Sequence, residues 1–110
     1  MNYQHQQLAK GEWFTLSLVQ QLAHVGSEVE RAINWKNKDN RQYSQMAFER
    51  ALELLSLTKD DPKNKLRLKE PTRLYELLAD YFAGDNSFGF SDEFWRSYFL
   101  AFAYAVSVGR

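Results

Sequence analysis

Apolar residues recur every three or four positions along most of this chain, which is the spacing of amphipathic α-helices. The first such stretch covers residues 13–38 and carries a heptad seam formed by Leu18, Leu22, Val25, Val29 and Ala32. Gly26 lies in the middle of this helix, where glycine costs about 1 kcal/mol relative to alanine. We therefore expect another helix to cross closely at Gly26.

Three more helices are predicted after this one. Residues 41–58 form the second, preceded by a turn in which Asp39 or Asn40 caps the helix. Residues 62–83 form the third, with Asp61 as N-cap and Pro62 at the first helical position. Because a proline removes a backbone hydrogen bond and clashes with the preceding turn, we expect a kink or break near Pro71.

The fourth predicted helix covers residues 92–107 and begins after a Ser91 cap. No stretch alternates long enough to predict a strand, and glycine and proline are few. The pattern therefore predicts an all-α fold, a four-helix up-down bundle. The chain length of 110 residues fits one domain, which we place at residues 12–110 behind a flexible, polar tail at 1–11.

The fourth helix is apolar on nearly every side, since only Arg96 and Ser97 are polar within its FWRSYFLAFAYAV run, residues 94–106. Such a helix must be covered on several sides, by the other helices or by a second copy of the chain. Aromatic enrichment with few charges is typical of an interface core. We expect a homodimer, with the interface residues Phe94, Trp95, Tyr98, Phe99 and Phe102.

The composition excludes several classes of protein. The apolar run is shorter than the roughly 20 residues that a membrane helix needs, so no membrane association is expected. The chain has no cysteine, which excludes disulfides and thiolate zinc sites and fits a reducing compartment. The N-terminal residues do not resemble a secretory signal, so a cytoplasmic location is expected.

Carboxylates at one-turn spacing are the first candidates for chemistry. Glu49 with Glu53, and Glu76 with Asp80, each share one helix face. If the second and third helices faced each other there, the four side chains could bind a metal or a phosphate group, although the Glu-x-x-His motifs of di-iron bundles are missing. The structural alternative is two solvated, charge-paired faces. His24 and Glu28 also lie one turn apart, but two ligands are fewer than a catalytic zinc requires.

A basic segment is the remaining candidate. Lys63, Lys65, Arg67 and Arg73 could contact phosphates near the start of the third helix. The zero net charge and the lack of interleaved aromatic residues argue against a nucleic-acid partner. We find no nucleophile motif, no phosphate-binding glycine loop and no cofactor motif.

Three phrases carry a resemblance to known proteins: GSEVERAINWKNKDN (26–40), AFERALELLSLTKDDPKNKLRLKE (47–70) and ADYFAGDNSFGFSDEFWRSYF (79–99). The chain resembles a family of small, uncharacterised all-helical proteins of bacteria and archaea, from which it departs at Pro71. It is also similar, more loosely, to the HEPN group of dimerising helical bundles. The ribonucleases of that group use an arginine followed four to six residues later by histidine, and no arginine here has such a histidine. The resemblance implies a compact, non-catalytic domain.

These observations favour a non-enzymatic binding or accessory module that self-associates and has a possible protein partner. The alternatives are a metal- or phosphate-dependent enzyme built on the four carboxylates, and a nucleic-acid binder built on residues 63–73.

Overall fold

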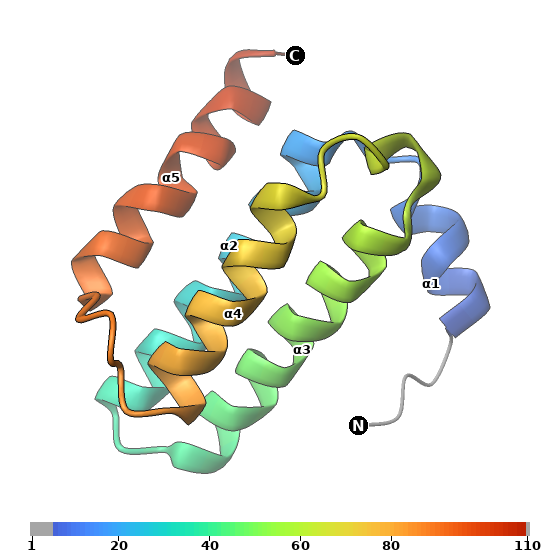
Figure 1. Cartoon of the computed structure of the whole chain (residues 1–110). Helices are drawn as coiled ribbons and strands as arrows, with labels where there is room; N and C mark the ends of the chain where they lie inside the picture. Colours follow the sequence, from blue (N-terminus) through green and yellow to red (C-terminus); the bar gives the residue numbers. More distant parts are fainter. Residues whose placement is uncertain (1–5, 110) are drawn as a thin grey trace.

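Every regular element in the described part of the chain, residues 6–109 of this computed structural model, is a helix (Figure 1). The all-α prediction is therefore confirmed. The elements are α1 (Gln6–Trp13), α2 (Leu18–Asn37), α3 (Arg41–Asp60), the 3-10 helix η1 (Pro62–Asn64), α4 (Lys69–Ala83) and α5 (Asp92–Val108).

The four longer helices run alternately in opposite directions, and α1 lies beside α3 (Figure 1). Close backbone packing joins α2 to α3, α2 to α5 and α3 to α4, but it does not join α4 to α5. The helices therefore form an arrangement that is closed on three sides and open between α4 and α5. This open side determines where the candidate surfaces lie.

The first predicted helix, residues 13–38, starts later in the structure, at Leu18, and a separate helix, α1, precedes it. Trp13 ends α1, and Ser17 begins α2 with a capping box in which Ser17 and Gln20 exchange hydrogen bonds. Trp13 is buried, and its Nε1 donates to Thr58 Oγ1 at 3.1 Å, which fixes α1 on the end of α3. The expected tail is wrong over residues 6–11, which belong to α1, and residues 1–5 lie outside the described residues.

The third predicted helix is broken, as expected for a segment that contains Pro71. Asp61 caps the short helix η1, a turn follows, and α4 starts at Lys69. Pro71 falls in the first turn of α4, where its missing N–H would have had no partner within the helix. The break thus precedes the proline, and the other predicted helix ends agree closely with α3 and α5.

A buried polar network holds η1 against α2 and α3. The side chain of Asn64 donates to Gln21 Oε1 at 2.8 Å and to the Thr58 carbonyl at 3.0 Å. Gln21 in turn donates to Asp61 at 2.8 Å. All four residues are buried, and these hydrogen bonds offset the free energy of removing their polar groups from water.

The apolar core lies among α2, α3, α4 and α5, where Leu22, Val25, Ile33, Leu55, Leu78 and Trp95 are almost completely buried. Of the helices described, none is long and apolar enough to cross a bilayer.

Candidate functional site

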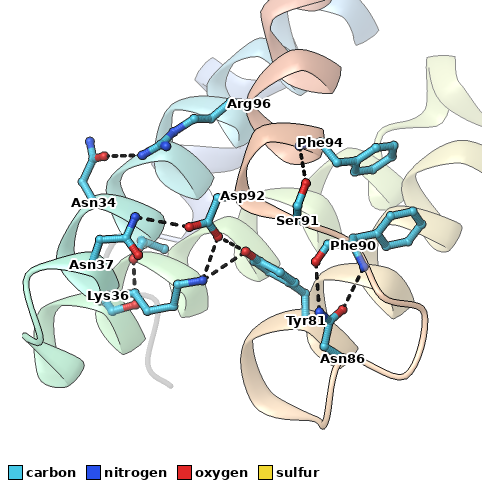
Figure 2. A network of polar contacts seen from close by, with 12 residues as sticks. Asn34, Lys36, Asn37, Tyr81, Asn86, Phe90, Ser91, Asp92, Phe94 and Arg96 are labelled. Atoms are coloured by element: carbon cyan, nitrogen blue, oxygen red, sulfur yellow. Dashed lines mark hydrogen bonds and ion pairs between the residues drawn. The ribbon is translucent and has the colours of Figure 1, made fainter.

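The start of α5 is fixed to the end of α2 by Asp92 (Figure 2). Asp92 Oδ1 accepts a hydrogen bond from Lys36 Nζ at 2.8 Å, and Oδ2 accepts one from Asn37 Nδ2 at 3.2 Å. The Tyr81 hydroxyl of α4 donates to the same carboxylate. Ser91 caps the first turn of α5, as predicted. Together these contacts set the direction in which α5 leaves the loop.

The surroundings of Asp92 favour its charged form. Burial of the carboxylate acts to raise its pKa, but the hydrogen bonds from Lys36 and Asn37 outweigh this and hold the pKa of Asp92 below its ordinary value. Folding is therefore coupled to the ionisation of this residue.

A second polar clamp lies one turn further along α5. Arg96 Nε donates to Glu30 at 2.8 Å, and its guanidinium also donates to Asn34 Oδ1 at 2.8 Å (Figure 2). The hydrogen bond to Glu30 raises the pKa of Arg96. No charged residue follows Arg96 until Arg110, so apart from the Tyr98 hydroxyl the rest of α5 packs through apolar contacts.

The inner face of α5 packs on α2 through Trp95 and Phe99. Trp95 is wholly buried and Phe99 is 5% exposed. A Cβ added to Gly26 would lie 2.7 Å from the Phe99 Cβ, closer than such atoms approach in proteins. The expected close crossing at Gly26 is thus present, and α5 is the crossing helix.

The opposite face of α5 is open to solvent. We define the outer face as the exposed residues that lie on one side of the helix, three, four or seven positions apart: Ser97, Leu100, Ala101, Tyr104 and Val108. Leu100 is 67% exposed, Tyr104 68% and Val108 62%. A row of exposed apolar side chains on an uncharged helix face is the composition of a surface that binds another protein.

A hollow lies beside the outer face, between α2 and α5. Its volume is about 370 Å³. The small residues Ala23, Gly26 and Ser27 line it from α2, and Leu100 and Ala103 line it from α5. The hollow therefore offers room for a large side chain next to the exposed residues of α5.

A second groove, of about 300 Å³, occupies the open side between α4 and α5. From α4 it is lined by Glu70, Arg73, Leu74 and Leu77, and from the other side by Phe90, Phe94, Trp95 and Tyr98. The Tyr98 hydroxyl donates to Glu70, which bridges the two helices at one end. Burial, and then the Glu70 carboxylate, raise the pKa of Tyr98 above its ordinary value.

Four stacked rings form a row beside this second groove, and three of them, Phe90, Phe94 and Tyr98, line it. Phe90 and Phe94 are stacked with centroids 4.3 Å apart and planes 18° from parallel. Phe88 stacks on the Phe90 end, and Tyr98 stacks on the Phe94 end. The loop that carries Phe88 and Phe90 is itself ordered, because Asp80 accepts hydrogen bonds from its backbone and Asn86 bonds to Phe90 in both directions.

The five residues predicted for the interface divide between core and surface. Trp95 and Phe99 belong to the core of one chain, Tyr98 and Phe102 are half-buried, and Phe94 is 40% exposed. The most exposed apolar residues of α5, Leu100 and Tyr104, were not among the predicted contacts. Their spacing marks a stripe, but only the position of α2 shows which stripe is left uncovered.

The four candidate carboxylates do not meet. Within residues 6–109, no three His, Asp or Glu side chains are placed to share a metal ion. Asp80 is engaged by the Ser87 and Phe88 backbone, and Glu49 accepts from Gln45. Burial raises the pKa of Glu53, with Arg50 and Glu49 as neighbouring charges. The convergence that the metal or phosphate hypothesis requires is missing from this part of the chain.

His24 and Glu28 also have separate surroundings. The His24 ring packs against Trp13 with centroids 5.7 Å apart. Glu28 is nearly buried, and its Oε1 lies 3.4 Å from Arg31. Neither side chain is directed toward a shared ligand by these contacts.

The predicted basic segment is divided in a similar way. Lys63 is committed to the Phe14 carbonyl, at 2.9 Å, and to Asp61. Lys65 and Arg67 are exposed in the turn before α4, whereas Arg73 lines the α4–α5 groove. The four side chains thus do not act as one phosphate-binding set.

No protein-family model matches this chain, and neither a curated protein nor a solved structure shows significant similarity to it. The family resemblances therefore stay predictions, and the functional argument depends on the surfaces of α5.

Proposed function

We propose that the protein is a non-enzymatic, self-associating binding module and that two copies meet through the outer face of α5. The observation that carries this proposal is the exposure of Leu100, Tyr104 and Val108 on a helix that has no charge after Arg96 among the described residues. Covering each of these side chains contributes up to about 1.5–3 kcal/mol to association.

A two-fold axis would bring the same surface of both copies together. This requires a surface without like-charge repulsion, and the outer face is uncharged. Ser97 and Ala101 are small enough to let two helices approach closely. The hollow between α2 and α5 would receive the Tyr104 ring of the second copy, so the surface has both a projecting side chain and a space for it.

A single helix face is a small interface. Association also costs several kcal/mol in lost translational and rotational freedom. We therefore expect a dissociation constant in the micromolar range, which corresponds to a binding free energy of roughly −8 kcal/mol. A cytoplasmic location, favoured by the absence of cysteine, is part of the proposal.

Charged substitutions on the outer face test this proposal. Leu100→Glu and Tyr104→Glu should each give a monomer in sedimentation velocity at concentrations where the unchanged chain associates, because two carboxylates would be buried at the contact. Met46→Glu is the matched control, since Met46 is 55% exposed on α3 and outside the outer face. If Met46→Glu prevents association and the two α5 variants do not, the interface has been placed on the wrong helix.

A further inference from the structure

We propose that the groove between α4 and α5 binds a small aromatic carboxylate, with the ring between the helices and the acid group at Arg73. The groove residues and the outer-face residues are different sets, so this inference does not depend on self-association.

The shape and lining of the groove suit a ligand of one or two rings. Its volume of about 300 Å³ lies at the lower end of the range for small-molecule sites. One wall consists of the row of stacked rings that includes Phe90 and Phe94, and the opposite wall carries Leu74 and Leu77. Because the rings of the first wall stack on one another, a flat ligand would lie with its face against their edges and press against the aliphatic side chains of the second wall.

The polar groups of the groove select the charge of the ligand. Arg73 is exposed, and it forms no ion pair within the described part of the chain. Glu70 already accepts from the Tyr98 hydroxyl. Glu70 keeps its negative charge in that hydrogen bond, so the selection for an anion rests on Arg73, the cation that lines the groove. A guanidinium binds a carboxylate through paired hydrogen bonds.

Trp95 supplies a second reason to expect an acceptor. It has no exposed surface, yet its Nε1 has no hydrogen-bond partner among residues 6–109. Unpartnered buried donors are uncommon in folded proteins. Trp95 lines both this groove and the hollow between α2 and α5, and a ligand oxygen that reached its N–H from the groove would supply the missing acceptor.

Calorimetric titration of the full chain with naphthoate tests the assignment, with naphthamide and naphthylmethylammonium as neutral and cationic probes of similar shape. We expect naphthoate to bind with a dissociation constant between about 0.1 and 1 mM, and the other two to bind at least about tenfold more weakly. Equal binding of the cationic probe, or no naphthoate binding at millimolar concentration, would show that the ligand class is wrong.

Arg73→Gln should weaken naphthoate binding by about tenfold, because one charge-assisted contact is lost. The affinity for naphthamide should stay the same. Arg67→Gln, an exposed basic residue outside the groove, is the control and should change neither. Both positions are exposed, so both variants should fold. An Arg73→Gln variant that binds naphthoate normally contradicts the proposal.

A second copy of the chain is the competing occupant of the groove. Leu77→Trp would fill the groove from the α4 side and should abolish naphthoate binding without changing the sedimentation coefficient. If Leu77→Trp instead removes self-association, the groove belongs to a protein contact and the ligand assignment is wrong.

Discussion

The α-carbon of Gly26 lies directly against the Phe99 side chain, so that a methyl group at position 26 would come within 2.7 Å of the Phe99 Cβ. This close approach is what brings α5 onto α2. It also determines which side of α5 is buried and which side is left for other molecules.

Gly26→Ala should destabilise the protein. The alanine gains about 1 kcal/mol of helix propensity, but the clash with Phe99 forces α5 away from α2 and costs about 1–3 kcal/mol or more. We expect a lower midpoint in thermal unfolding followed by circular dichroism.

Gly11→Ala provides the comparison for this prediction. Gly11 lies in α1, and an added Cβ there would meet no atom within 4 Å. It should raise stability by about 0.5–1 kcal/mol through helix propensity. Stabilisation by both substitutions would mean that α2 and α5 do not cross as closely as described.

Asp92 should make stability depend on acid pH. Folding lowers the pKa of Asp92 below its ordinary value of 3.8. The stability that the ionised carboxylate contributes is therefore complete at pH values above the unfolded pKa, and it is lost as the pH falls through the folded pKa. Urea titrations between about pH 5 and 2 should therefore show a smaller loss of stability for Asp92→Asn than for the unchanged chain.

At neutral pH the same variant should be less stable by about 1–2 kcal/mol, because Lys36 and Asn37 lose a charged acceptor. If Asp92→Asn follows the pH profile of the unchanged chain, then the contacts of Asp92 drawn in Figure 2 do not form in solution.

Asn64→Ala should weaken the junction of α2, α3 and η1. The substitution leaves Gln21 Oε1 without a donor, whereas the Thr58 carbonyl still accepts from the Asp61 backbone N–H at 3.4 Å. Because an unsatisfied buried group costs about 1–3 kcal/mol, chemical denaturation should report a loss of about that size. Gln45→Ala, at an exposed position on α3, should stay within about 0.5 kcal/mol. If Asn64→Ala changes the stability no more than Gln45→Ala does, the buried network adds nothing to stability.

Divalent cations should not stabilise the protein. A ligand that binds only the folded state raises the unfolding temperature, by an amount that grows with the logarithm of its concentration relative to its dissociation constant. Because Glu49, Glu53, Glu76 and Asp80 do not converge, millimolar Mg²⁺ or Mn²⁺ should leave the midpoint unchanged. An increase that disappears in Glu49→Gln would restore the metal hypothesis.

Much of the fold could be predicted because the signals are local. Asn40 and Ser91 cap α3 and α5 as expected, since each supplies a side-chain acceptor to the first helical turn. The division between α1 and α2 was missed because apolar spacing continues through Trp13 and Leu16. The pattern Ser17-x-x-Gln20 is a capping-box signature and could have revealed the true start of α2.

The candidate surfaces were harder to predict because they depend on contacts between distant residues. The abundance of apolar residues in α5 indicated that the helix needs covering by the other helices or by a second copy, and in one chain Leu100, Tyr104 and Val108 stay exposed. However, Trp95 and Leu100 look equivalent in the sequence, and only the crossing at Gly26 separates core from surface. The groove at Arg73 depends on how far α4 and α5 lie apart, which no local pattern encodes.

The most direct test of self-association is the mass of the unchanged chain by light scattering after size exclusion, across a micromolar concentration series. We predict a mass that rises with concentration toward twice the 12.9 kDa of one chain. A mass that stays at that of a single chain across the whole series would contradict the proposal that α5 joins two copies.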